Sequence, residues 1–272
     1  MCRFVAFLGK EPVILSDIIA APENSLIRQS LEARLGHIAL NADGFGIAWY
    51  DHSIDHAPGI FKSIQPAWND FNLRHLASKV RSTCFLGHVR ASTVGDVNTY
   101  NCHPFNDQQF SFVHNGTIEG FQKIKRELRR ILDDVEFELL RGQTDSEHFF
   151  ALLMDILHHG YETFTLDAQF EAYQKALKQI EVLTADVNVE ESSRLNTVLT
   201  DGKQLLASRY VSDPSEVAWS LYYQTKVDNN NEPISIIVAS EPLTETEEGW
   251  QKIPTNHALL VDESLNVSLR AL

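Results

Sequence analysis

The sequence has few cysteines and no long apolar run. Its three cysteines are Cys2, Cys84 and Cys102, and no Cys-x-x-Cys pair occurs. Such a sparse, odd set excludes a disulfide framework and offers no thiolate zinc site. No apolar run approaches the roughly 18 residues that suggest a membrane span. The apolar stretch near the N-terminus, about five residues long, is shorter than that of a secretory signal. We therefore expect a cytoplasmic protein with no membrane partner, and we expect Cys84 to pack in a strand.

Basic residues are also scarce. The 272-residue chain has 23 Lys and Arg against 37 Asp and Glu, which gives a formal net charge of −14. An acidic chain repels nucleic acid, so no partner of this class is expected. Hydrophobic residues make up 43% and charged residues 22%, which is ordinary for a globular enzyme. No internal repeat or low-complexity tract occurs, and we expect a single domain over residues 1–272.

Strand-type runs occur in both halves of the chain and often follow one another without a helix between them, which favours antiparallel sheets. They lie at residues 4–8, 46–50, 84–89, 110–114, 197–200, 205–210, 234–240 and 257–261. Helical periodicity recurs at residues 121–132, 145–157 and 170–183. A polar segment at 185–194 suits a surface loop. We expect helices combined with mostly antiparallel strands, with residues 195–272 completing the sheets begun by the first half.

Cys2 is the first candidate for chemistry. Removal of Met1, which is normal before a small residue, would leave this cysteine at the start of the chain. Its thiol is a nucleophile, and its own α-amine, with a pKa near ~7.7–8.0, is matched to exchange a proton with a thiol whose pKa is near ~8.5. Taken alone, a cysteine at position two is more often a buried structural residue. The interpretation of Cys2 as a catalytic residue therefore depends on the motifs that follow it.

Three motifs in the first part of the chain combine turn residues with polar side chains. Residues 41–46, NADGFG, carry two glycines around an aromatic, which predicts a turn or a close backbone approach. Residues 87–93, GHVRAST, place Arg90 at a strand end. A guanidinium at this position can bind a carboxylate, or it can be an ordinary surface arginine that faces the solvent. Residues 101–105, NCHPF, form a compact polar turn around His103, which is structural by default.

Two later motifs have both a structural and a functional interpretation. In FVHNGTI, the pair Asn115-Gly116 is first of all a hairpin turn signal. The Asn115 side chain and the Gly116 backbone N–H also suit an oxyanion hole. In TDSE, Thr144 and Glu147 fit a capping box at the start of a helix. Asp145 is then a first-turn acid, comfortable with the helix dipole and equally able to face a ligand ammonium.

Together these motifs resemble those of the class II glutamine amidotransferases, which are N-terminal-nucleophile hydrolases. Cys2 is followed, in family order, by NADGFG, GHVRAST, NCHPF, FVHNGTI and TDSEHF, all within the first 150 residues. The opening MCRF, the run SLIRQS and NADGFG are similar to the γ-glutamyl amidohydrolase of ergothioneine biosynthesis. Further stretches resemble the fungal Dug-type subunit that degrades glutathione, and this resemblance spans nearly the whole chain. These stretches are residues 66–69, 88–93, 101–105, 144–147, 200–202, 208–210, 239–244 and 253–256.

The resemblance implies an α+β fold, the four-layer αββα sandwich, with the catalytic motifs in residues 2–147. It implies Cys2 as the nucleophile, with Asn115 and the Gly116 backbone as the oxyanion hole. The implied substrate-binding residues are Arg90 for the α-carboxylate of a γ-glutamyl group, Asp145 for its α-ammonium, and Thr93 and His103 as pocket lining.

The reaction that the resemblance implies is hydrolysis of a γ-glutamyl amide bond through a γ-glutamyl thioester, with release of glutamate. The small-molecule substrate would be glutathione, a related γ-glutamyl compound or glutamine, and no metal or organic cofactor is required. Ala91 stands where the ammonia-using glucosamine-6-phosphate synthases carry an aromatic, and the chain is too short for their synthase domain. Both points favour a hydrolase. A peptidase-like partner protein would fit the Dug-type resemblance.

Three alternatives stay open. The nearest alternative is a glutaminase subunit that passes ammonia to a separate synthetase partner. A degenerate, non-catalytic binding subunit would keep the fold without turnover. A metallohydrolase would use His88, His103 and His114 near strand ends, with Asp43, although no HxH or HExxH spacing occurs.

Overall fold

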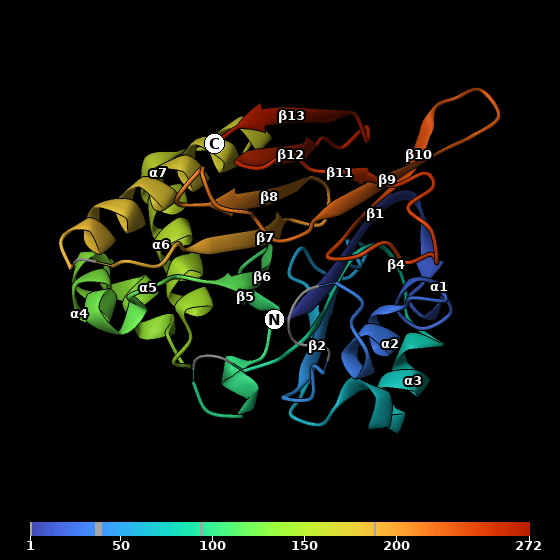
Figure 1. Ribbon diagram of the computed structural model, residues 1–272. Helices are drawn as coiled ribbons and strands as arrows, with labels where there is room; N and C mark the ends of the chain where they lie inside the picture. Colours follow the sequence, from blue (N-terminus) through green and yellow to red (C-terminus); the bar gives the residue numbers. More distant parts are fainter. Residues whose placement is uncertain (1, 36–39, 93–94, 188) are drawn as a thin grey trace.

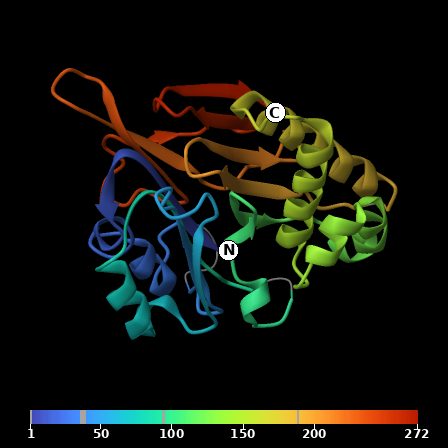
Figure 2. The same cartoon turned by 180° about the vertical axis from the view of Figure 1, so that it is seen from behind.

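The protein folds into four layers, with helices on the outside and two β-sheets between them (Figures 1 and 2). The computed structural model describes residues 2–35, 40–92, 95–187 and 189–272. One sheet carries helices α1 (Ser16–Ile19), α2 (Leu26–Leu31) and α3 (Phe71–Ala77). The other carries helices α4 (Phe121–Ile131), α5 (Asp134–Leu139), α6 (Asp145–Gly160) and α7 (Leu166–Ala185). This arrangement confirms the αββα sandwich.

The first sheet has seven strands in the order β11-β9-β10-β1-β4-β2-β3, and its neighbours pair in antiparallel fashion. Strand β1, which begins directly after Cys2, lies in the middle of the sheet between β10 and β4. The strands are β1 (Arg3–Ile14), β2 (Phe45–Trp49), β3 (Gly59–Ser63), β4 (Arg81–Val89), β9 (Tyr222–Val227), β10 (Pro233–Ala239) and β11 (Gln251–Lys252).

The second sheet has six antiparallel strands in the order β13-β12-β8-β7-β6-β5. Its strands are β5 (Phe105–Asp107), β6 (Phe110–Thr117), β7 (Arg194–Thr200), β8 (Leu205–Val211), β12 (His257–Val261) and β13 (Val267–Ala271). The last third of the chain therefore supplies strands to both sheets. Residue 239 pairs with residue 5, so a strand from late in the chain pairs with the first strand in the first sheet.

Three hydrophobic cores hold the layers together. Phe4 and Leu86 belong to the core between the sheets. Phe7 and Phe85 stack with their ring centroids 5.2 Å apart in the core under α1, α2 and α3. Phe112 lies in the core under α4, α6 and α7. Because the central strands are buried on both faces, they read in the sequence as nearly continuous apolar runs rather than as alternating ones.

Each predicted strand run and each predicted helix falls within an observed element or extends one residue beyond its end. The strand at 84–89 is part of β4, with Cys84 fully buried as expected. The helical face predicted for residues 170–183 is also confirmed, since Tyr173, Ala176, Leu177 and Ile180 are all buried in α7. The sequence reading missed β3 and β9, whose polar residues dilute the strand pattern.

Two local predictions were wrong. Asn115 and Gly116 do not form a hairpin turn, because both lie inside β6 and pair with Asn196 and Leu195 of β7. The long-range ladder overrides the local turn preference of Asn-Gly. Only half of the capping box forms. Thr144 Oγ1 accepts from the Glu147 N–H at 3.2 Å, but the Glu147 carboxylate accepts from backbone amides of the preceding loop instead.

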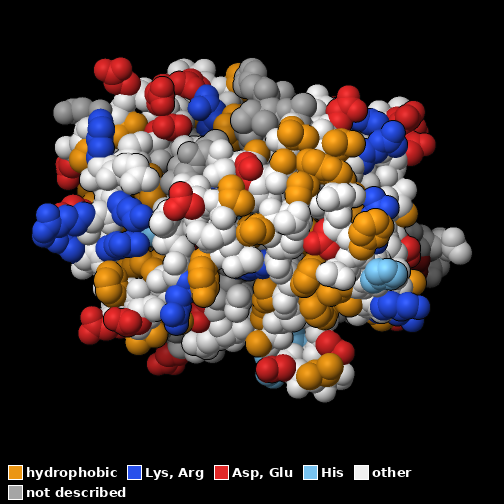
Figure 3. All heavy atoms as spheres, turned by 90° about the horizontal axis from the view of Figure 1, so that it is seen from below, with side chains coloured by type: hydrophobic (Ala, Val, Ile, Leu, Met, Phe, Trp, Pro, Cys, Tyr) orange, Lys and Arg blue, Asp and Glu red, His pale blue; other side chains and the backbone are white. Residues whose placement is uncertain are grey.

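The outer surface mixes charges of both signs. Figure 3 shows one face of the molecule, on which acidic and basic side chains are interspersed and hydrophobic side chains gather in patches between them. The net charge of −14 is therefore not a uniform acidic field on this face. Within the described part of the chain, no helix combines the length and the apolar character needed to cross a membrane.

Candidate active site

Cys2 directly precedes β1 and is half-buried. Its Sγ lies 3.4 Å from the backbone N and 3.5 Å from the backbone O of Ala91, the second residue after β4. Burial raises the pKa of the Cys2 thiol, while the Ala91 backbone and the charges of Arg90 and Arg3 lower it. Because burial dominates, the thiol is protonated at neutral pH and needs a base before it can act as a nucleophile.

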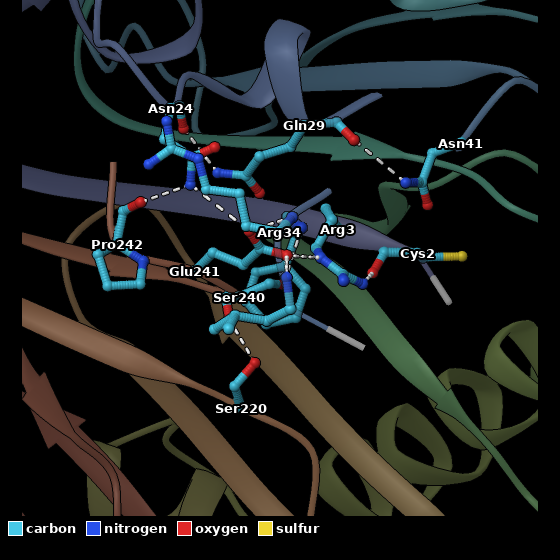
Figure 4. A network of polar contacts seen from close by, with 12 residues as sticks. Cys2, Arg3, Asn24, Gln29, Arg34, Asn41, Ser220, Ser240, Glu241 and Pro242 are labelled. Carbon is cyan, nitrogen blue, oxygen red and sulfur yellow. Dashed lines mark hydrogen bonds and ion pairs between the residues drawn. The ribbon is translucent and has the colours of Figure 1, made fainter. Parts of the chain in front are cut away.

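A buried ion pair holds the backbone of Cys2. Arg3 donates from Nε to Glu241 Oε1 at 2.6 Å, and its guanidinium also donates to the carbonyl oxygen of Cys2 at 2.8 Å. Both charged side chains are almost completely buried. Figure 4 shows that the Cys2 sulfur points away from this ion pair. The ion pair therefore holds the main chain of Cys2 and leaves its thiol free to face elsewhere.

The Glu241 carboxylate connects several separate segments of the chain (Figure 4). Besides Arg3, it accepts from the backbone N–H of Arg34 at 3.0 Å and of Leu35 at 2.9 Å. The Asn24 amide lies 3.5 Å from it and donates to the Pro242 carbonyl at 2.7 Å. A buried carboxylate is tolerated where its lone pairs are matched by donors in this way.

Arg90 lies just beyond the end of β4 and is buried. Its guanidinium donates to Ser92 Oγ at 3.0 Å and to the carbonyl oxygens of Asp96 at 3.2 Å and Gly95 at 3.3 Å. Its backbone N–H donates to the carbonyl of Gly44 at 2.8 Å. Arg90 thus joins the NADGFG segment to the loop that follows β4, and it places a positive charge near Cys2.

Asn115 and Gly116 lie side by side near the end of β6. Asn115 is buried, and its Oδ1 has no hydrogen-bond partner among the residues that the structure describes, which is uncommon for a buried amide. Gly116 has no room for a side chain, since an added Cβ would lie 1.9 Å from the Arg194 carbonyl oxygen and 2.0 Å from His114 Nε2. Close packing therefore requires glycine here.

Asp145 begins α6 and is buried. Its Oδ2 accepts from the Ile118 N–H at 2.8 Å, and its Oδ1 accepts from the Ser146 N–H at 2.9 Å. These bonds join the start of α6 to the residue that follows β6. Asp145 therefore already has a structural role, and its two oxygens keep further lone pairs for a ligand.

The three histidines of the metal-site alternative lie in the interior. The rings of His88 and His103 are 4.1 Å apart, and His88 Nε2 lies 3.2 Å from the carbonyl oxygen of His114. Burial lowers the pKa of His88 to about 3 and lowers the pKa of His103 and His114 as well. All three are therefore neutral at pH 7. His103 precedes a cis peptide bond to Pro104, and neither of its ring nitrogens makes a hydrogen bond to a described residue.

The geometry does not support a metal centre at these histidines. In the described residues, one set of three possible ligand atoms lies within 4.8 Å, and it belongs to Glu136, Asp155 and His159. None of these is among the predicted site residues. The three histidines therefore do not form the metal-ligand set that the metallohydrolase alternative needs.

Sequence reasoning missed the residues that hold Cys2 in place. Thr93, predicted to line the pocket, lies outside the described residues, as does Met1. Arg3, Glu241 and the Ala91 backbone were not predicted. The contact between Arg3 and Glu241 joins positions 238 residues apart, so no local pattern reveals it. The proximity of Cys2 and Ala91 follows from the pairing of β1 with β4.

Known proteins resemble this chain over nearly its full length. The class-II glutamine amidotransferase family matches residues 16–267. The probable glutamine amidotransferase DUG3 of Saccharomyces cerevisiae is 36% identical, covering 96% of this chain and 82% of that protein. A γ-glutamyl-hercynylcysteine sulfoxide hydrolase of Mycolicibacterium smegmatis is 27% identical, covering 96% of this chain and 95% of that protein.

Solved structures agree with these sequence matches. A glutamine aminotransferase class-II domain protein from Silicibacter pomeroyi has a TM-score of 0.70 and 27% identity, and it covers 100% of this chain and 99% of its own. The glutamine phosphoribosylpyrophosphate amidotransferase of B. subtilis shares the fold, with a TM-score of 0.63 and 15% identity over 99% of this chain and 49% of its own. From its sequence and its fold, the chain belongs to the class-II glutamine amidotransferases.

Proposed function

We propose that this protein hydrolyses γ-glutamyl amide bonds with the thiol of Cys2, after removal of Met1. The observation that carries the proposal is the placement of Cys2, whose half-buried Sγ contacts the Ala91 backbone beside Arg90 at the start of a central strand. The family supports amide chemistry, and one relative is named as a γ-glutamyl hydrolase. The substrate class is a γ-glutamyl compound, such as glutathione or glutamine.

The proposed reaction begins with the α-amine of the processed chain. This amine takes the proton of the Cys2 thiol, which burial keeps protonated, and the thiolate attacks the γ-carbonyl carbon. The Asn115 side chain and the Gly116 N–H stabilise the oxyanion that forms. The C–N bond then breaks, the α-ammonium protonates the leaving amine, and a γ-glutamyl thioester remains. Water attacks the thioester, glutamate leaves, and the thiol is restored.

Recognition of the γ-glutamyl end would use charges of both signs. In the proposal, Arg90 binds the α-carboxylate, because its guanidinium is buried and stays positive. Asp145 binds the α-ammonium with the lone pairs that its backbone contacts leave. Thr93 and His103 line the pocket. The neutral state of His103 at pH 7 suits a lining role rather than binding of an anion.

A second candidate is a glutaminase subunit that delivers ammonia to a synthetase, since the matched family is defined by glutamine amidotransfer. We favour hydrolysis, because the M. smegmatis relative that this chain matches nearly end to end is named as a hydrolase. A peptidase-like partner protein would fit the hydrolase candidate. A synthetase partner would fit the candidate that delivers ammonia.

Glutamate release from two substrates separates these candidates. The protein, with its N-terminus checked by mass spectrometry, is incubated with glutathione and with glutamine. We expect release from glutathione, with no release by Cys2→Ala and ordinary release by the matched control Cys84→Ala. Release from glutamine alone would favour the ammonia-donor function. Turnover that survives Cys2→Ala would overturn the proposed mechanism.

A further inference from the structure

A groove lies between α5, α6 and β5, apart from the residues proposed for catalysis. Its volume is about 210 Å³. One face of α6 forms its floor, with Glu147, Phe150, Ala151 and Met154 at helical spacing. None of the residues proposed to bind or attack the γ-glutamyl group lines it.

One end of the groove is acidic. Glu136 is 3% exposed, and its Oε2 has no hydrogen-bond partner among the described residues, while its Oε1 lies 3.1 Å from His158 Nδ1. Asp107 Oδ2 lies 3.5 Å from the other ring nitrogen of His158 and makes no hydrogen bond within the described part of the chain. Two carboxylates thus share one histidine. Even with that histidine charged, this end has a net negative charge and a buried acceptor left over.

The other end is basic. The ammonium of Lys62 lies 5.1 Å from the centroid of the Phe105 ring, and no carboxylate in the described residues comes within ion-pair distance of it. Burial lowers the pKa of Lys62 to about 8, so the side chain is still mostly charged at pH 7. The nearby Glu147 carboxylate is occupied by the backbone N–H groups of Arg141 and Gly142. Lys62 therefore supplies the positive charge at this end of the groove.

The residues that mark the two ends lie close together along β5. Phe105, whose ring lies under the Lys62 ammonium, and Asp107 are two residues apart on this strand, so their Cα atoms are ~6.6 Å apart. An extended dipeptide spans about 7 Å. Between the charged ends the groove is apolar, with Phe150, Ala151 and Met154.

From these contacts we infer that the groove binds a small zwitterion of dipeptide size, with its ammonium at Glu136 and Asp107 and its carboxylate at Lys62. The inference rests on the groove alone and stands without the proposed reaction. The first turn of α6 carries both Asp145 and Glu147, so this ligand would lie against the same helix as the candidate active site.

Calorimetric titration of the full-length protein with glycylglycine tests this inference. We expect saturable binding, weakened about tenfold or more in N-acetyl-glycylglycine, which lacks the ammonium, and in glycylglycinamide, which lacks the carboxylate. Equal affinity for all three compounds, or no saturable binding to glycylglycine, would overturn the inference.

Variants locate the binding site. Glu136→Gln and Lys62→Met each remove one charge with little change in size, and each should weaken glycylglycine binding about tenfold or more. Glu138→Gln changes an exposed acid on the same helix and should leave the affinity unchanged. Thermal unfolding of each variant checks that it folds. Wild-type affinity in folded Glu136→Gln and Lys62→Met would place glycylglycine elsewhere and contradict the inference. If Glu136→Gln failed to fold, the two capped peptides and Lys62→Met would still decide it.

Discussion

Arg3 restrains the residue that carries the proposed nucleophile. Once Met1 is removed, Cys2 is the end of the chain, and chain ends are poorly ordered unless they are held. The 2.8 Å bond from the Arg3 guanidinium to the Cys2 carbonyl oxygen holds this end. Glu241 fixes the guanidinium in turn. We expect Arg3 and Glu241 to act through Cys2, as positioning residues.

Replacement of Arg3 should affect both the rate and its pH dependence. In Arg3→Met the chain end is no longer held, so we expect kcat to fall about tenfold or more with little change in KM. The charge of Arg3 lowers the pKa of Cys2, so its loss should raise that pKa and move the acid limb of the pH–rate profile to higher pH. Arg3→Lys keeps the charge and should keep the wild-type limb. An unchanged profile in Arg3→Met would contradict this role.

The variant Glu241→Gln tests the same charge effect in the opposite direction. It removes the carboxylate that faces the Arg3 charge, so the pKa of Cys2 should fall and the acid limb should move to lower pH. Removal of one partner of a buried ion pair also costs about 3–5 kcal/mol of stability, so thermal unfolding is measured in parallel. If the acid limb of the pH–rate profile moved in the same direction in Arg3→Met and in Glu241→Gln, the charge of Arg3 would not explain the shift of that limb.

Among the elements, β6 carries the two proposed oxyanion donors and tolerates no added atom at Gly116. In Gly116→Ala the new Cβ would meet the Arg194 carbonyl of β7 and the His114 ring. We expect a loss of stability of about 1–3 kcal/mol, or more if the strands must separate. Gly160→Ala is the control, because a Cβ added there would meet no side chain or packed neighbour of the described residues within 4 Å. Denaturant unfolding of both variants measures the difference, and equal stability would contradict the packing described for β6.

The buried histidines between the sheets predict a stability loss in acid. Burial lowers the pKa of His88 from 6.5 to about 3, so the unfolded chain binds a proton that the folded chain does not. This contribution is complete above pH 6.5 and is lost as the pH falls toward 3, by about 1.4 kcal/mol per pH unit. Urea unfolding gives the free energy of unfolding at pH 7 and at pH 5. The decrease in this free energy from pH 7 to pH 5 should therefore be smaller for His88→Gln than for the wild type. The same difference in both proteins would exclude this role for His88.

At the scale of the whole molecule, the sequence predicted more of the fold than of the site. Apolar runs such as residues 84–89 and 234–240 identified central strands, because burial on both faces leaves a strong local signal. The motif order indicated the family. Local patterns misread Asn115 and Gly116 as a turn, because the pairing with β7 depends on residues about 80 positions later. For the same reason Glu241 and the groove at Glu136 were not predicted.

The central claim is that Cys2 carries the γ-glutamyl group during turnover, and mass spectrometry of the acid-quenched and digested protein tests it most directly. The protein, confirmed to begin at Cys2, is mixed with glutathione, quenched within the first turnovers and digested. We predict a mass increase of one glutamyl residue on the N-terminal peptide, which hydroxylamine removes and which is absent from Cys2→Ala. A glutamyl adduct on another residue, or glutamate release during which Cys2 stays unmodified at every quench time, would contradict the claim.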